Sequence, residues 1–431
     1  MGEHADLLAR HREVMPSWMA LYYDEPIALV DGDGRYVVDA EGNRYLDFFG
    51  GILTTMSGYN IPEVVEAIRD QAGKMLHSST LYLIEQQIEL AERIADLSGI
   101  PDAKVFFTNS GTEANDAALM MATQFRGSNQ VLALRNSYHG KSHSAVAVTG
   151  NNAWSATQLS PFHTVYVQSG YRYRSPFKHL DDEAYIAACA DDLRDLLRIA
   201  ISGQAACLLA EPIQGVGGFA TPPDGYFAGL KDVLDEHGIL FISDEVQTGW
   251  GRTGEHFWGY QAHGITPDLM TFAKGLGNGV AIAGVVGRAD IIDVISANSI
   301  STFGGNPLAT SAALANLDYV IDNDLQTNSH KVGQQLMRDI RHLQDEVPAM
   351  GDVRGKGLMI GVEFVVPGST DPDTETTSAV MEGAKRRGLL LGKGGLLGNV
   401  LRIAPPLSIT SEEATEGYQI LAESIRDATG D

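Results

Sequence analysis

The sequence predicts an α/β fold, in which a mostly parallel sheet flanked by helices is followed by a smaller α+β unit. Three observations carry this prediction. Short apolar runs alternate with helical patterns between about residues 105 and 272. Polar or charged residues follow the carboxyl end of each run. After about residue 325 the alternation gives way to a few strands and helices of a separate unit.

The amino-terminal part favours antiparallel strands. Residues 28–48, ALVDGDGRYVVDAEGNRYLDF, contain short strands separated by Asp-Gly and Gly-Asn turns. We therefore predict that residues 1–60 form a segment with antiparallel strands that packs with the smaller domain. From about residue 61 apolar residues recur at helical spacing, at Val64, Ile68, Ala72 and Met75 and again at Ile84, Ile88, Ala91 and Ala95.

Residues 61–325 are predicted to form the large domain. Between two of its apolar runs, Phe227, Leu230, Val233 and Leu234 share one helix face, as expected for strand–helix–strand units. The runs are VFFT at 105, VLAL at 131, AACLLA at 205, ILFIS at 239 and LMTFA at 269.

Residues 326–431 are predicted to form the small C-terminal domain. KGLMIGVEF and VLRIA resemble strands, and the polar stretch at 366–378 is interpreted as a surface loop. The last helix is expected to start at Thr410, because Thr410 and Glu413 have the spacing of a capping box.

Composition excludes several classes of protein. The 431 residues carry a net charge of −24, so nucleic-acid binding is not expected. The two cysteines, Cys189 and Cys207, form no close pair and suit a reducing compartment. The amino terminus lacks a signal-peptide apolar stretch, and residues 275–287 are too few to span a bilayer. We expect a soluble cytoplasmic protein without a membrane partner.

The polar residues at the strand ends predict one site. In an open α/β sheet, ligands bind at the carboxyl ends of the strands. An anion-binding turn, an aromatic pair, two acidic positions and an amine all fall there. They are Asn109-Ser-Gly-Thr-Glu113, Tyr138 and His139, Glu211, Asp244-Glu245, and Lys274.

These residue types suit a phosphorylated aromatic aldehyde. Ser110, Gly111 and Thr112 would open a helix whose free N–H groups hold a phosphate, although this turn taken alone is better explained by an ordinary Ser/Thr N-cap. Asp244 would pair with a protonated ring nitrogen, or else cap the next turn. Lys274, kept neutral by a desolvated pocket, would form a Schiff base with the aldehyde.

Other motifs favour different ligands more weakly. Residues 249–254, GWGRTG, fit G-x-G-x-x-G, but they do not directly follow a strand and no helical pattern begins there, so a nicotinamide site is disfavoured. Gly140-Lys-Ser142 resembles the end of a P-loop, but Arg135 stands where that motif needs glycine. His139 and His143 lack the glutamate of a zincin helix, so no metal is expected.

Six stretches follow one another along the chain: FTNSGTEAN, NSYHG, LLAEPIQG, ILFISDEVQTGWGRTG, DLMTFAKGLGNG and STFGGNPLA. In this order they resemble the signatures of class III aminotransferases, which are fold-type-I enzymes dependent on pyridoxal 5′-phosphate (PLP). The resemblance runs from about residue 22 to Pro406. It implies a large domain with a mostly parallel seven-stranded sheet, a small C-terminal domain, and a homodimer or tetramer with shared active sites.

The resemblance also implies a role for each matching residue. Lys274 matches the Schiff-base lysine and Asp244 the partner of the pyridine nitrogen. Further matches are Tyr138 stacked on the ring with His139 beside it, Gly111 and Thr112 in the phosphate turn, Gln247 near the ring hydroxyl, Glu211 bordering the substrate, and Thr302 reaching the phosphate of the neighbouring subunit.

Arg402, in VLRIAPPL, matches the arginine that receives a substrate carboxylate, although a surface ion pair would also explain it. Relatives that use glutamate often carry Glu after EPIQG, whereas this chain continues Val-Gly-Gly-Phe219. The resemblance is therefore to the alanine–glyoxylate and amine–pyruvate branches. Tyr22, Phe49 and Ile52 would line the substrate pocket, where aromatic rings favour hydrophobic groups.

The expected activity is transfer of an amino group from an amino acid or amine to pyruvate or glyoxylate by a ping-pong mechanism. Two alternatives remain: a decarboxylating aminotransferase or aminomutase of the same fold, and an NAD-dependent oxidoreductase based on residues 249–254.

Overall fold

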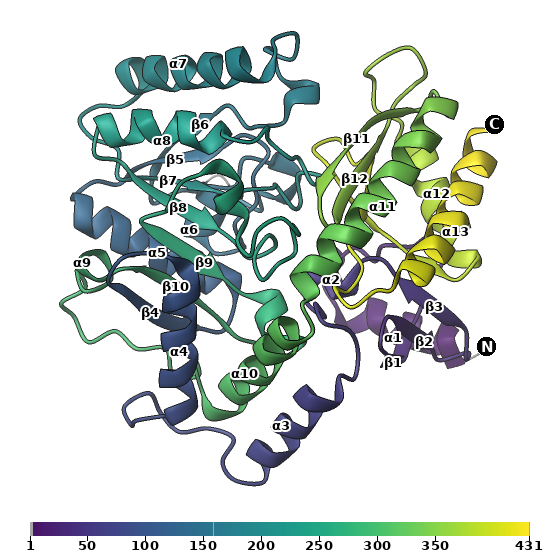
Figure 1. The fold of residues 1–431 in the computed structure, drawn as a ribbon, viewed down its shortest axis with the longest axis horizontal. Helices are drawn as coiled ribbons and strands as arrows, with labels where there is room; N and C mark the ends of the chain where they lie inside the picture. The colour runs from purple at the N-terminus through teal and green to yellow at the C-terminus, as the bar shows by residue number, and fades with distance from the viewer. Residues whose placement is uncertain (1–2, 158, 431) are drawn as a thin grey trace.

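The computed structural model describes residues 3–157 and 159–430. It confirms the α/β class, with a mostly parallel seven-stranded sheet and a smaller C-terminal domain. Figure 1 shows the two domains side by side, with the purple amino-terminal strands next to the yellow last helix. Arg35 and Glu413 form an ion pair between these two segments, with a nitrogen–oxygen distance of 2.7 Å.

The central sheet has the strand order β4-β10-β9-β8-β7-β5-β6. All five predicted apolar runs are strands, whereas β6 and β10 were not predicted because their polar and glycine residues interrupt the apolar pattern. β10 runs antiparallel to both neighbours, so the other six strands direct their carboxyl ends to one edge. The bounds are β4 (Ala103–Thr108), β5 (Gln130–Leu134), β6 (His163–Val167), β7 (Cys207–Ala210), β8 (Leu240–Asp244), β9 (Leu269–Phe272) and β10 (Ala283–Arg288).

Helices cover both faces of this sheet. In β7, Leu209 packs in the core under α5 (Gly111–Arg126), whereas Leu208 packs with α7 (Asp182–Ala200) and α8 (Tyr226–Glu236). This alternation follows from the period of two in a strand. The remaining helices of this part of the chain are α3 (Pro62–Ala72), α4 (Glu85–Ser98), α6 (His143–Ala147), α9 (Ala289–Ile292) and α10 (Pro307–Asp322), with 3₁₀ turns at Asn152–Trp154, Arg172–Arg174, Gly259–His263 and Lys274–Gly277.

The amino-terminal strands are antiparallel, as predicted. The third of them also pairs in parallel with a short strand of the C-terminal part, β13 (Leu389–Leu390). The elements are α1 (Glu3–Val14), β1 (Leu29–Asp33), β2 (Tyr36–Asp39), β3 (Arg44–Asp47) and α2 (Gly50–Leu53). The domain limits at residues 60 and 325 stay predictions.

The small domain has a sheet in the order β11-β12-β15-β14. Both predicted strands, in KGLMIGVEF and VLRIA, belong to it, and the capping box of Thr410 and Glu413 is present. Its elements are α11 (Leu325–Glu346), β11 (Met350–Lys356), β12 (Met359–Phe364), α12 (Thr374–Arg386), β14 (Gly392–Gly394), β15 (Val400–Ile403) and α13 (Ser411–Thr429).

The predicted surface loop at 366–378 is only partly a loop. Its last part belongs to α12, which begins at Thr374 and buries Thr377. Asp373 caps this helix by accepting a hydrogen bond of 2.8 Å from the Thr376 amide. The prediction missed the helix because its polar first turn precedes the apolar face. Within the described residues, no helix combines the length and apolar character needed to cross a bilayer.

Candidate active site

The parallel strands bring the predicted site residues together at one edge of the sheet. Asp244 is the last residue of β8, Glu211 directly follows β7, and Lys274 lies just beyond the end of β9. These three strands are neighbours. Arg402 and Glu211 both hydrogen-bond Gly215, and Glu211 and Asp244 hold the adjacent residues Tyr138 and His139. These groups and Lys274 therefore share one site, where their charges act on the lysine amine.

Lys274 is half-buried, with its backbone in the left-handed region at φ 44°. Burial lowers the pKa of its amine from 10.5 to about 8, and Arg402 lowers this pKa further while Asp244 and Glu211 oppose the shift. At pH 7 roughly a tenth of such amines are neutral, compared with a negligible fraction of an ordinary lysine. Lys274 is therefore usable as a nucleophile and a base near neutral pH.

Asp244 is buried and its carboxylate is held by three hydrogen bonds. Oδ2 accepts from Asn115 Nδ2 at 2.8 Å and lies 2.7 Å from His139 Nδ1. Oδ1 accepts from the Val246 amide at 3.1 Å, so the turn-capping role is also real. The arrangement fixes the position of the carboxylate within the site.

Asn115 is a positioning residue that the sequence analysis did not identify. Its Nδ2 also donates to the His139 carbonyl at 2.9 Å, and its Oδ1 accepts from Thr271 Oγ1 at 2.7 Å. Asn115 thus joins α5 and β9 to Asp244 at the end of β8. One signal was available, because Asn115 is a polar residue on the alanine-rich buried face of α5.

The amino end of α5 has the geometry of an anion site. Gly111 and Thr112 are its first residues, and their amides have no partner within the helix. A Cβ at Gly111 would lie 3.2 Å from both Val246 methyl groups, so the backbone there packs closely against the strand ends. The Thr112 hydroxyl accepts a hydrogen bond of 3.3 Å from the Lys141 amide.

Ser110 is the N-cap of α5. Its hydroxyl accepts from the Glu113 amide at 3.3 Å, and the Glu113 carboxylate accepts from the Ser110 amide at 3.1 Å. The structure therefore supports the N-cap interpretation of Ser110. The hydroxyl hydrogen remains free to donate to an anion.

Glu211 orients the aromatic side of the site. Its Oε1 accepts from the Tyr138 amide at 2.9 Å and its Oε2 from the Gly215 amide at 2.8 Å. Burial raises the pKa of Glu211 to about 7, an effect that His139 opposes and Asp244 reinforces. The Tyr138 ring meets the Trp154 ring edge to face at a centroid distance of 5.4 Å, a contact that the sequence did not reveal.

Two buried polar atoms at this site lack a hydrogen-bond partner within the described residues. They are Oε1 of Gln247 and Nε2 of His139. Unsatisfied buried polar atoms are costly, and they are common where a ligand completes the site. Together with the α5 amides, Asp244 and the Lys274 amine, they fit a planar heterocycle that carries a phosphate and an aldehyde.

Arg402 is 1% exposed, which excludes the surface ion-pair interpretation. Its Nε donates to the Lys393 carbonyl at 3.1 Å, its Nη1 to the Gly215 carbonyl at 3.3 Å, and its Nη2 to the Tyr22 hydroxyl at 2.7 Å. None of these partners carries a charge, so within the described residues the guanidinium is buried without a carboxylate.

The three predicted substrate residues near the amino terminus differ in position. The Tyr22 and Phe49 rings lie 5.4 Å apart, and the Phe49 ring centroid is 4.8 Å from Arg402 Cζ. Ile52 is 43% exposed and lies on a left-handed turn, with φ 65°. Tyr22 and Phe49 therefore border the arginine, whereas the role of Ile52 stays a prediction.

Thr302 is exposed and does not join the Lys274 group. It lines a surface cavity of about 810 Å³ together with Asn109 and Glu113, beside the amino end of α5. Its predicted role concerns a neighbouring subunit, which a single chain does not test.

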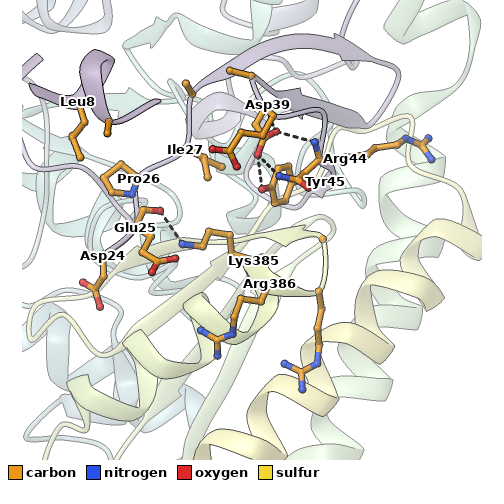
Figure 2. A pocket seen from close by; sticks show the side chains of 17 residues that line it. Leu8, Asp24, Glu25, Pro26, Ile27, Asp39, Arg44, Tyr45, Lys385 and Arg386 are labelled. Carbon is orange, nitrogen blue, oxygen red and sulfur yellow. Dashed lines mark hydrogen bonds between the residues drawn. The ribbon is translucent and has the colours of Figure 1, made fainter. Parts of the chain in front are cut away.

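A second cavity of about 750 Å³ lies away from this site, between the amino-terminal segment and the end of α12. Figure 2 shows Lys385 and Arg386 on one side of it and Asp39 and Tyr45 on the other. Lys385 pairs with Glu382 at 2.6 Å, and the Asp39 carboxylate accepts from Tyr45 at 2.8 Å. Lys385 and Asp39 thus have partners of their own, and Arg386 is exposed.

The G-x-G-x-x-G stretch at 249–254 forms turns, with no helix at its end. Arg252 within it is buried and donates to the carbonyls of Leu358 and Pro405. The stretch therefore joins the two domains and lacks the helix amino end that a dinucleotide site uses. Among the described residues, no group of three or more His, Cys, Asp or Glu could hold a metal ion.

Comparison with known proteins agrees with this geometry. An alanine–glyoxylate aminotransferase 2 homologue, mitochondrial, from Arabidopsis thaliana is 40% identical over 420 residues, which cover 96% of this chain and 86% of that protein. An alanine/serine racemase from Pyrococcus horikoshii is 33% identical over 434 residues, 98% of this chain and 90% of that protein.

A solved structure shows the same likeness. The PLP-bound amine transaminase from an uncultivated Pseudomonas species has a TM-score of 0.89 and 32% identity, covering 97% of both chains. The model of the family described as aminotransferase class-III matches residues 19–425. The chain therefore belongs to the class III aminotransferases, which depend on pyridoxal 5′-phosphate.

Proposed function

We propose that this aminotransferase moves an amino group from an amino acid or amine to a small 2-oxo acid, pyruvate or glyoxylate, in two half-reactions that both use Lys274. The observation that carries the proposal is Arg402, a buried guanidinium that shares a site with Lys274 and has no carboxylate partner within the described residues. An unpaired buried charge is costly, and a substrate carboxylate would compensate it.

The residues around Arg402 favour a small acceptor. After Gln214 the chain continues Gly215-Val216, so this loop brings no acidic side chain to the arginine. Three of the five guanidinium N–H groups are used, which leaves two for a carboxylate. The relative named alanine–glyoxylate aminotransferase supports the same acceptor class.

Different residues of the chain have different roles in the proposed reaction. The bound cofactor supplies an electron sink that stabilises negative charge on the carbon next to nitrogen. Asp244, fixed by Asn115 and His139, would hold a proton on the ring nitrogen. Gly111 and Thr112 would bind the phosphate through their amides, and Lys274 would carry the proton between the substrate carbon and the cofactor.

We also propose that the protein works as a homodimer, or as a tetramer built from such dimers. Thr302 and Phe303 are exposed next to the cavity at the amino end of α5, and Leu81, Tyr82 and Leu83 are 67%, 71% and 92% exposed. Consecutive exposed apolar residues of this kind mark interaction surfaces. Thr302 would then contact the phosphate bound by the partner subunit.

The racemase relative makes other reactions of the same fold worth testing. A racemase would interconvert D- and L-alanine without an acceptor, and a decarboxylating enzyme would release carbon dioxide. The proposed transaminase should form alanine from pyruvate in proportion to the donor consumed. A nicotinamide enzyme would do none of these.

Arg402→Ala tests the acceptor proposal. Truncating one partner of a buried arginine–carboxylate pair costs about 2–5 kcal/mol. We therefore expect kcat/KM for pyruvate to fall roughly thirty-fold or more. The half-reaction with an arylalkyl amine, which has no carboxylate, should stay close to the wild-type rate.

Measuring the two half-reactions separately decides the matter, with exposed Arg386→Ala as the control. Equal losses of rate in the half-reactions with the 2-oxo acid and with the amine would mean that Arg402 stabilises the small domain and does not bind the substrate carboxylate.

A further inference from the structure

The loop between Gln214 and Phe219 has every one of its backbone carbonyls hydrogen-bonded. The whole loop is buried, so water cannot satisfy these carbonyls and each needs a donor from the protein. The donors are Arg402 Nη1 to Gly215 O at 3.3 Å, the Gly395 amide to Val216 O at 2.9 Å, Asn136 Nδ2 to Gly217 O at 3.1 Å, and Arg354 Nε and Nη2 to Gly218 O at 3.1 and 2.8 Å.

Most of these donors come from the small domain. Arg354 is on β11, Arg402 on β15, and Gly395 directly follows β14. The contact is also close, because a Cβ at Gly361 of β12 would lie 2.6 Å from Gly218 O. The loop is therefore seated directly on the small-domain sheet.

Two buried arginines hold the opposite ends of this loop, but their charges are balanced differently. Arg354 Nη1 donates to Asp352 at 2.6 Å and to Glu363 at 2.8 Å. Arg402 has no acidic partner within the described residues. Arg354 is complete without a ligand, whereas Arg402 lacks an anion.

The acidic side of this network is built to keep Arg354 in place. Glu363 is fully buried, and it also accepts from Tyr171 Oη and from Arg174 Nε, the latter at 2.6 Å. Tyr171 packs under the Arg354 guanidinium at 4.5 Å from its ring centroid. Arg354 therefore has one orientation, which directs Nε and Nη2 at the loop.

We propose that Arg354 is a positioning residue of the substrate-carboxylate site. By holding Gly218 O it fixes the loop whose Gly215 O orients Arg402, so it sets the affinity for the 2-oxo acid without touching it. The inference rests on the proposed function, because it takes the ligand of Arg402 to be a carboxylate.

The expected consequence is on binding more than on chemistry. A bidentate arginine–carboxylate contact needs directed N–H groups, and a shift of the Gly215 carbonyl would rotate them. The proton-transfer groups, Lys274 and Asp244, are held by other elements. Gly215 also donates to Glu211 at the cofactor side of the site, so some effect on kcat is expected. A displaced loop should raise KM for the acid more than it lowers kcat.

Arg354→Lys is the first test. A single ammonium keeps the charge beside Glu363 but cannot also make both bonds to Gly218 O. We expect KM for pyruvate to rise about ten-fold, with much smaller changes in kcat and in cofactor binding. Tyr171→Phe is the matched comparison, because it removes one of the bonds to Glu363 but keeps the ring beside Arg354 and both bonds to Gly218 O, so KM should rise much less than in Arg354→Lys.

Gly361→Ala is a second route to the same displacement. Gly361 lies opposite both Arg354 and Arg402 in the small-domain sheet. The substitution changes none of the charged residues and places a methyl group against Gly218 O, so it should raise KM for pyruvate in the same way. This variant also decides the question if Arg354→Lys does not fold.

An unchanged KM in folded Arg354→Lys or Gly361→Ala enzyme would overturn the proposal, as would an equal rise in Tyr171→Phe. Failure of the wild-type enzyme to aminate any 2-oxo acid would instead contradict the proposed function, on which this inference depends.

Discussion

At the scale of single residues, the site depends on how burial changes ordinary side chains. Lys274 keeps its amine half-buried between the positive charge of Arg402 and the negative charges of Asp244 and Glu211, and the net effect is a pKa of about 8. Desolvation is the largest cause. Lys274, just past the end of β9, is thereby reactive at a pH where an exposed lysine is not.

This pKa predicts how the apoenzyme takes up its cofactor. Only the neutral amine attacks an aldehyde, so the rate of PLP uptake should rise with pH and level off above about 8, the folded pKa. Absorbance of the bound cofactor after rapid mixing gives the rate at each pH. An inflection near the ordinary lysine pKa would show that the amine is solvated.

The position of Asp244 in the sequence does not reveal which residues hold its carboxylate. Asp244 could be identified from its place at the end of an apolar run, but its two side-chain partners come from separate elements. Asn115 is on α5 and His139 follows β5. Their convergence is a property of the sheet order.

At the scale of elements, the amino end of α5 combines a helix cap with an anion site. Ser110 and Glu113 satisfy each other's amides in a capping box, while the amides of Gly111 and Thr112 have no partner within the helix and are proposed to bind the phosphate. The N-cap interpretation therefore applies to Ser110, and the phosphate-site interpretation applies to Gly111 and Thr112.

Ser110→Ala separates these roles. Loss of an N-cap costs about 1 kcal/mol, so we expect the free energy of unfolding of the apoenzyme to fall by that amount. PLP affinity should fall less than in Gly111→Ala, where the new Cβ presses on Val246 at 3.2 Å. Denaturant titration and cofactor titration measure the two effects. A large loss of PLP affinity with unchanged stability would make the Ser110 hydroxyl a direct ligand.

At the scale of the whole molecule, the site depends on how the parts of the chain meet. In Figure 1 the small domain lies beside the carboxyl edge of the large sheet, and from there β15 supplies Arg402. The amino-terminal segment contributes Tyr22 to the same arginine. Thr302, in contrast, is exposed and is proposed to serve a partner subunit.

Mixed dimers test that proposal. Lys274→Ala and Thr302→Ala should each be impaired alone, the first without turnover and the second with weaker PLP binding. A dimer that contains one of each has one site with wild-type Lys274 and wild-type Thr302 from its partner. Refolding the two variants together should therefore restore turnover and tight PLP binding at that site.

If mixing the two folded variants does not increase turnover or PLP binding, Thr302 acts only within its own subunit. Refolding each variant with itself is the control for any effect of the procedure.

Sequence alone determined the α/β class, the five predicted strands and the residues that follow them, because hydrophobic periodicity and strand ends are local patterns. It also identified Lys274, Asp244 and Arg402. It missed β6 and β10, whose polar and glycine residues interrupt the apolar pattern, and it missed α12, whose first turn is polar.

Only the tertiary structure decided which charges are paired. Arg354 and Arg402 are both arginines in strands of one sheet, yet one meets two carboxylates and the other meets uncharged oxygen atoms within the described residues. Several partners of these arginines are backbone carbonyls of a loop distant in the sequence, and every residue type has a backbone carbonyl. The sequence does not reveal hydrogen bonds to backbone carbonyls, because only the folded chain determines which carbonyls lie near each arginine.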